Sequence, residues 1–102
     1  MKIDRAVVIR FTRATKHPLR IAILERLEEV PIASPKELSE HFDESLGVAS
    51  YHVGELNNVE AIELVKTEPR RGAAEHFYAI TDYGRMTLQA ARYITKKAKA
   101  IS

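Results

Sequence analysis

The chain has 102 residues, of which 45% are hydrophobic, and its 16 lysines and arginines against 14 acidic residues give a net charge of +2. This length allows one hydrophobic core, and the composition is that of a soluble globular domain. The sequence contains no cysteine, which excludes disulfides, thiolate metal sites and cysteine nucleophiles. No apolar run reaches the roughly 20 residues that cross a bilayer, and the Met1-Lys2 start lacks the apolar core of a signal peptide, so we expect a cytoplasmic protein that does not enter a membrane.

Two helices are predicted in the first third of the chain. Residues 3–14 are expected to form the first, because four apolar side chains recur at offsets of four, four and three: Ile3, Val7, Phe11 and Ala14. The β-branched residues at 7–9 leave a strand as the alternative for this segment. Pro18 suits the first turn of a second helix, which Pro31 ends.

A pair of short helices is predicted next. Ser34-Pro35-Lys36-Glu37 is typical of a helix start, with serine as the cap, proline in the first turn and glutamate reaching back. This helix is expected to end near Phe42. Ser45 can cap the following helix, which Asn57-Asn58 would end and whose inner face carries three apolar residues: Ala49, Val53 and Leu56.

Beyond residue 60 the sequence changes to a pattern typical of strands. Residues 62–67 alternate, residues 77–81 form a second β-prone run, and Pro69-Arg70-Arg71-Gly72 between them predicts a turn. The whole segment is therefore predicted to be a two-stranded hairpin with a basic tip. Thr81 or Asp82 can cap a last helix, along which apolar residues recur at offsets of three, four and three: Tyr83, Met86, Ala90 and Tyr93.

Elements in this order predict a mainly α fold with a small β-hairpin, a single winged helix-turn-helix domain over residues 1–102. The helix-turn-helix would span residues 34–58 and the wing residues 62–81, while residues 1–15 and 82–102 would form N- and C-terminal dimerisation helices. In such a domain the second helix of the pair fits the major groove, and arginines at the wing tip reach phosphates or the minor groove. The last helix is too long for so small a body to cover, so we expect a homodimer interface built from both outer helices: Val7, Phe11, Met86, Ala90 and Tyr93.

Four sequence pieces in this order resemble one known family. Residues 17–21 look like an "HPLR" opening, and residues 50–53 with Leu56 look like an "S-x-H-L-x-x-L" helix. Residues 70–72 and 77–81 are similar to an "RRG…YY-x-L-T" wing. From about His17 to Arg85 the chain thus resembles the ArsR-type bacterial and archaeal repressors. The resemblance implies dimers that bind operator DNA and block transcription.

Carried over residue by residue, the resemblance implies DNA contacts from the second helix of the pair and from the wing: Ser45, Leu46, Gly47, Val48, Ser50, Tyr51, His52, Arg70 and Arg71. Residues 46–48 stand where the family has glutamine, serine and threonine, and they offer no side-chain hydrogen bond to a base edge. We therefore expect contacts with thymine methyl groups, shape readout and strongly salt-dependent binding. For His52, a packed position and a phosphate contact both remain open.

The predicted function is that of a sequence-specific regulator of transcription that binds double-stranded DNA as a dimeric repressor. The alternative is a winged-helix module for protein–protein interaction, favoured by the acidic segment 36–60, which has one lysine and six acidic residues. No pair among the four histidines has the spacing of a metal site, and no nucleophile, base and orienting group stand in register. We therefore predict no metal, no cofactor and no enzyme activity, and the effector and operator remain open.

Overall fold

Residues 4–101 are described by the computed structural model, so Ile3 and its expected place on the first helix lie outside the described part. The elements follow the chain as α1 (Arg5–Thr15), α2 (Pro18–Glu29), α3 (Pro35–Phe42), α4 (Leu46–Asn58), β1 (Ile62–Arg70), β2 (Ala73–Ile80) and α5 (Asp82–Ile101). The first segment is a helix, and the strand alternative for residues 7–9 is wrong. The mainly helical fold with one hairpin is confirmed.

Side-chain caps at Ser34, Ser45 and Thr81 start three of the helices where the sequence predicts. Ser34 Oγ accepts a 3.1 Å hydrogen bond from the Glu37 N–H, and Glu37 Oε1 accepts one of 3.1 Å from the Ser34 N–H, which completes a capping box. Thr81 Oγ1 likewise accepts a 3.0 Å bond from the Gly84 N–H at the start of α5. These local bonds satisfy N–H groups that have no partner within their own helix.

One hydrophobic core lies where α2, α4, α5 and the base of the hairpin meet. The inner face predicted for α4 is confirmed, because Ala49, Val53 and Leu56 are all buried. The other members of the hydrophobic core come from several elements: Ile23, Leu24, Leu38, Ile62, Ile80 and Leu88. The helix pair is thereby held on a rigid base.

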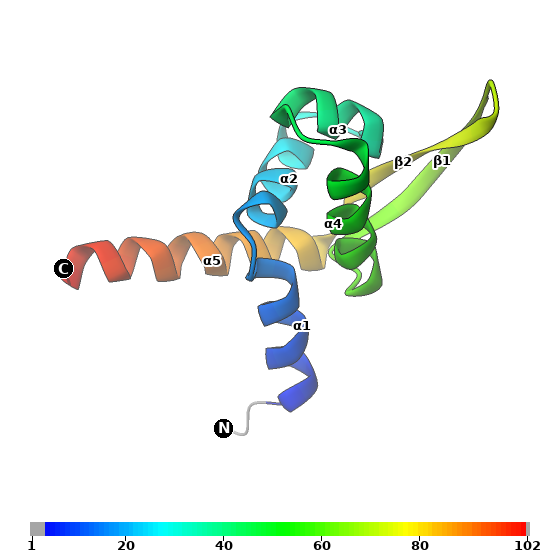
Figure 1. Cartoon of the computed structure of the whole chain (residues 1–102). Helices are drawn as coiled ribbons and strands as arrows, with labels where there is room; N and C mark the ends of the chain where they lie inside the picture. Colours follow the sequence, from blue (N-terminus) through cyan, green and yellow to red (C-terminus); the bar gives the residue numbers. More distant parts are fainter. Residues whose placement is uncertain (1–3, 102) are drawn as a thin grey trace.

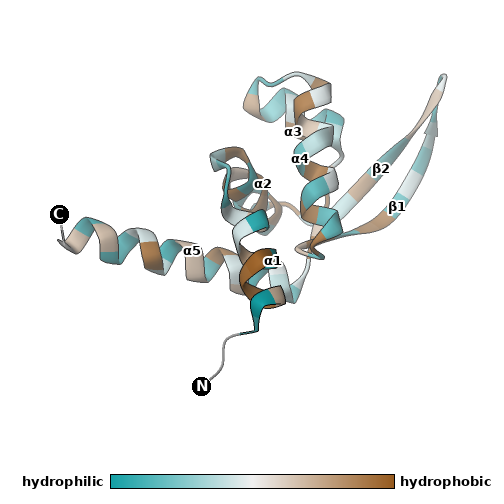
Figure 2. Ribbon diagram, turned by 60° about the horizontal axis from the view of Figure 1, so that its bottom comes forward, coloured by the Kyte–Doolittle hydropathy of each residue, from teal (hydrophilic) through white to brown (hydrophobic). Residues whose placement is uncertain are grey.

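Two elements extend away from this core in opposite directions. Figure 1 shows the hairpin as a long arm on one side and the C-terminal half of α5 on the other, while α1 projects from the body beside α5. The described chain is accordingly elongated, with extents of 50 × 29 × 22 Å. Figure 2 shows hydrophobic residues on α1. The run from Val7 to Ile9 on this helix is exposed.

The hairpin is longer than the sequence predicts. β1 and β2 pair antiparallel from Ile62 opposite Ile80 to Arg70 opposite Ala73, so the turn lies within the predicted segment 69–72 but is shorter than that segment. The actual turn is Arg71-Gly72, and the glycine takes the positive φ of 82° that such a turn requires. Pro69 can remain in β1 because both strands of a two-stranded sheet are edges, where proline is tolerated. A bulge between Leu64 and Lys66 also breaks the alternation predicted for residues 62–67.

Candidate nucleic-acid interface

Helix α4 turns an uncharged surface to solvent along its first half. Five of its first six residues are exposed: Leu46, Gly47, Val48, Ser50 and Tyr51. The residues Leu46, Val48 and Tyr51 are 54%, 39% and 57% exposed, although all three are large and apolar or aromatic. Exposed groups of this kind on a helix that is packed on its other side are typical of a contact surface.

A sharp turn joins α3 to α4. Asp43 ends α3 in the left-handed region with φ of 54°, a conformation that aspartate tolerates better than most residues. Ser45 then caps α4, because its Oγ accepts a 3.1 Å hydrogen bond from the Val48 N–H. Residues 43–45 therefore place the start of α4 next to the end of α3, which is the arrangement of a helix-turn-helix.

His52 is on the inner side of α4. It is only 6% exposed, and its Nδ1 accepts a 3.0 Å hydrogen bond from Nε of Arg20, which is 1% exposed. Burial lowers the pKa of His52, and the nearby His17 and Arg20 lower it further. Of the two alternatives that the sequence left open for His52, the structure shows the packed position, so its side chain is not among the exposed residues of α4.

Arginines of α1 and α2 hold the second half of α4, a role that the sequence analysis missed. Arg20 Nη1 donates a 2.5 Å hydrogen bond to the Arg13 carbonyl, and its Nη2 lies 3.9 Å from a carboxylate oxygen of Glu55. Arg10 Nη2 donates a 2.8 Å bond to the Val59 carbonyl at the end of α4. Since these partners are 7 to 49 residues apart in the chain, no local pattern signals them.

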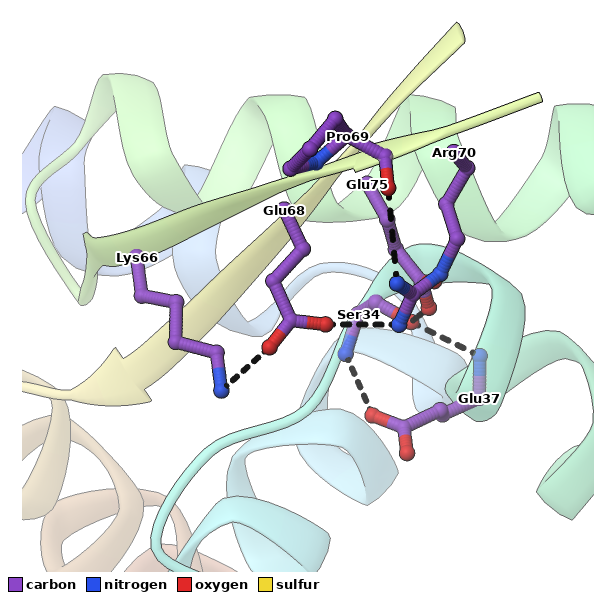
Figure 3. A network of polar contacts seen from close by, with 7 residues as sticks. All are labelled: Ser34, Glu37, Lys66, Glu68, Pro69, Arg70 and Glu75. Atoms are coloured by element: carbon purple, nitrogen blue, oxygen red, sulfur yellow. Dashed lines mark hydrogen bonds and ion pairs between the residues drawn. The ribbon is translucent and has the colours of Figure 1, made fainter. Parts of the chain in front are cut away.

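The two arginines of the wing tip have different surroundings. Arg70 lies between two carboxylates: its Nη2 is 2.6 Å from Glu68 Oε2, and its Nε donates a 2.9 Å bond to Glu75 Oε1 (Figure 3). The bonds to Glu75 and Glu68 raise the pKa of Arg70. Arg71 is exposed and forms no ion pair with any residue in the described part of the chain.

A groove connects the wing to the start of α4. It has a volume of about 490 Å³, and its lining includes one cationic side chain from α3, Lys36, and two from the wing, Arg70 and Arg71. Leu46 and Ser50 contribute the α4 side. The uncharged surface of α4 and the free cation Arg71 therefore belong to one continuous surface.

The sequence matches no protein-family model and no curated protein. Its structure is similar to that of an ArsR family transcriptional regulator, with a TM-score of 0.65 at 22% identity over 98% of this chain and 97% of the other. It is also similar to the homodimeric winged helix-turn-helix DNA-binding domain of a possible ArsR-family regulator from Mycobacterium bovis (TM-score 0.71, 16% identity, 95% and 90% covered). A third similar structure is Streptococcus pneumoniae FabT in complex with DNA (TM-score 0.58, 19% identity, 91% and 68% covered).

The chain has the winged helix-turn-helix fold. In this winged helix, α3 and α4 form the helix-turn-helix and the β1–β2 hairpin forms the wing. Transcriptional regulators are among the solved structures that share this fold with the chain.

The outer helices of the winged helix carry apolar side chains that its own core leaves uncovered. Val7 is 51% exposed, Met86 66% and Tyr93 63%. Ala90 is also exposed, whereas Phe11 is half-buried and lines a groove of about 580 Å³ between α1, α2 and α5. All five residues predicted for dimerisation therefore lie on α1 or α5 with at least part of their surface free.

Metal-ligating side chains do not gather in the part of the winged helix that the structure describes: no three of its histidine and acidic residues lie close enough to hold an ion. Among the same residues, no helix is long and apolar enough to cross a membrane.

Proposed function

We propose that this winged helix is an ArsR-type transcriptional regulator that binds double-stranded DNA, with α4 in the major groove and the wing on the neighbouring backbone. The observation that carries the proposal is the continuous surface that joins the exposed first half of α4 to Arg71. Insertion into the major groove requires a helix that is held on one face and exposed on the other. Helix α4 meets this requirement, because its inner face is buried and it packs against α3.

The surface of α4 favours apolar and hydroxyl contacts over hydrogen bonds to base edges. Leu46 and Val48 would lie against thymine methyl groups, and Ser50 and Tyr51 would offer hydroxyls. Ser45 accepts the capping bond through its oxygen and can donate its own proton to a phosphate. A phosphate at this point would also meet the positive end of the α4 dipole.

Electrostatic attraction would come from the margins of this surface. Arg71 and Lys36 flank the groove and can neutralise phosphates on either side of α4.

Gly47 has nothing within 4 Å of the position that a Cβ would take, so the backbone of α4 can approach the DNA closely there.

A homodimer would complete the interface, because one winged helix contacts one half-site. The exposed residues of the outer helices, Val7, Met86, Ala90 and Tyr93, are suited to a second copy of the chain. The M. bovis domain that the chain resembles is homodimeric, which supports this assembly. Two α4 helices would then bind half-sites about one helical turn, roughly 34 Å, apart. A dimer bound over a promoter in the cytoplasm would act as a repressor.

The test is a titration of the protein into a labelled random-sequence duplex at low salt, repeated at several salt concentrations. Wild type is expected to bind with an affinity that falls steeply with salt, and the Arg70→Ala/Arg71→Ala double variant is expected to bind more weakly with a shallower salt slope. Arg85→Ala is the matched control, because Arg85 is an exposed cation on α5 that pairs with Asp82. Binding that does not depend on salt would contradict the proposal.

The second candidate function, a module for protein–protein interaction, is favoured by the acidic end of α3. Glu40, Asp43 and Glu44 are exposed and form no ion pairs within the described residues. These carboxylates would repel phosphates if they faced the DNA. Failure of the wild-type protein to bind duplex even at low salt would support this alternative.

A further inference from the structure

Two carboxylates face each other directly across the wing. Glu68 of β1 and Glu75 of β2 are opposite partners in the strand register. Like charges at directly opposed positions destabilise a hairpin unless a cation lies between them. The wing therefore contains an arrangement that needs compensation in order to form.

Arg70 supplies that compensation. It lies two residues beyond Glu68 on the same strand, so both side chains emerge on one face, and its guanidinium bridges Glu68 at 2.6 Å and Glu75 at 2.9 Å. Lys66, on the same face, pairs with the other oxygen of Glu68 at 2.7 Å. The two positive charges of this network balance its two negative charges, and Arg70 is paired with carboxylates of the wing itself (Figure 3).

The same network reaches the start of α3. Ser34 Oγ donates a 2.5 Å hydrogen bond to Glu75 Oε2 and accepts the capping bond from the Glu37 N–H. Ser34 is completely buried, so its hydroxyl has a fixed place in the helix cap. Figure 3 shows the continuous line of contacts from Arg70 through Glu75 to Ser34. The bond from Ser34 is the main reason that the pKa of Glu75 is lowered.

A pair of backbone hydrogen bonds also links the wing to the segment just before α3. Ala33 and Tyr78 exchange backbone hydrogen bonds of 3.0 and 2.9 Å near the base of the hairpin. A two-stranded hairpin attached only at its base would be free to bend along its length. The Ser34–Glu75–Arg70 contacts add a second attachment point closer to the tip.

We propose that Arg70 is a positioning residue, which through Glu75 and Ser34 fixes the angle of the wing against α3 and so determines where Arg71 meets the DNA backbone. The DNA part of this inference rests on the proposed function, whereas the attachment itself is a property of the free protein. Arg70 and Arg71 thus have separate roles, although both were expected to contact DNA from the sequence.

Two variants separate this role from simple charge. Arg70→Lys keeps the positive charge but loses the planar fork that binds two carboxylates at once. Glu75→Gln removes a negative charge from the wing and frees Arg70, so charge alone predicts tighter DNA binding, whereas a positioning role predicts weaker binding. Glu63→Gln is the control, because Glu63 is an exposed carboxylate of the hairpin, on β1, that lies outside the network.

The first measurement is amide hydrogen exchange of residues 66–76 in the free protein. We expect Arg70→Lys and Glu75→Gln each to raise exchange there at least about threefold, with the control unchanged, because local opening limits exchange in weakly attached segments. Unchanged exchange in both variants would overturn the proposal, whether or not the protein binds DNA.

The second measurement is the affinity for duplex at several salt concentrations. We expect both variants to bind at least about threefold more weakly, with the salt slope of Arg70→Lys equal to that of wild type because no charge is lost. Faster exchange combined with unchanged or tighter binding would overturn the positioning role. If wild type does not bind duplex, the proposed function fails, and the exchange data still decide whether Arg70 anchors the wing.

Discussion

Nε of Arg20 on α2 donates a 3.0 Å hydrogen bond to Nδ1 of His52 on α4, and both side chains are buried. The bond requires a lone pair on Nδ1, so His52 accepts it only in the neutral form. The centre of the His17 ring lies 4.4 Å from that of the His52 ring, and a carboxylate oxygen of Glu55 lies 3.9 Å from Nη2 of Arg20. The bond that links α2 to α4 therefore requires an unprotonated His52.

Acidification is expected to destabilise the fold through His52. Its pKa is lowered in the folded state, so the unfolded chain, with an ordinary value of 6.5, binds a proton first as the pH falls. The contribution of His52 is therefore complete above pH 6.5 and decreases as the pH falls below it. Urea unfolding at pH 7.5 and 5.5 should show a smaller free energy of unfolding at the lower pH.

The His52→Gln variant isolates this effect. A glutamine carbonyl can still accept the bond from Arg20 but does not titrate, so the loss between pH 7.5 and 5.5 should be smaller than in wild type. Glu68 and Glu75, whose pKa values are lowered from 4.5, titrate below this window. An equal pH dependence in both proteins would show that His52 does not carry it.

Alanine at two helical glycines should have opposite effects on stability. A Cβ at Gly84 would meet the Ala61 carbonyl oxygen and crowd the Ile80 side chain, so Gly84→Ala is expected to destabilise by at least about 2 kcal/mol. A Cβ at Gly54 has nothing within 4 Å. Gly54→Ala in the middle of α4 is therefore expected to stabilise by about 0.5–1 kcal/mol. Denaturant unfolding of both variants measures the difference, and the same sign in both would contradict it.

Substitutions of two leucines of α4 are expected to separate effects on stability from effects on DNA binding. Leu56 is fully buried, and Leu56→Ala should cost about 2–5 kcal/mol of unfolding free energy. Leu46 is 54% exposed, so Leu46→Ala should change stability by less than about 0.5 kcal/mol. If Leu46 contacts a thymine methyl group, the same variant should bind operator DNA about threefold to tenfold more weakly. Unchanged binding by a folded Leu46→Ala protein would remove this residue from the interface.

Acidic substitutions on α5 should dissociate the dimer. Met86→Glu and Tyr93→Glu each replace a large exposed side chain with a carboxylate. A charge buried in a dimer interface without a partner is strongly unfavourable. Analytical ultracentrifugation at micromolar concentration should show dimers of wild type and monomers of the variants. Asn58→Glu, at an exposed position at the end of α4, is the control and should remain dimeric. A wild-type protein that is monomeric under these conditions would contradict the proposed assembly.

Much of the secondary structure could be predicted from the sequence because its signals are local. The capping box at Ser34, the cap at Ser45 and the apolar spacing of Ala49, Val53 and Leu56 involve residues only a few positions apart. Backbone geometry links such neighbours directly, so their chemistry predicts where a helix begins and which face is buried. The order of these elements was enough to predict the winged helix.

The candidate site depended on contacts that only the tertiary structure creates. Buried His52 accepts a hydrogen bond from Arg20, 32 residues earlier. Arg70 pairs with Glu68 and Glu75, and Glu75 is held in turn by Ser34, 41 residues away. Pro69 suggested a turn, yet the pairing of β1 with β2 carries the strand through it. Contacts between distant residues leave no periodic pattern in the chain, because they depend on where whole elements lie once the core has formed. The sequence alone therefore determined the elements and their order, and the tertiary structure decided which side chains remain exposed and unpaired at the candidate interface.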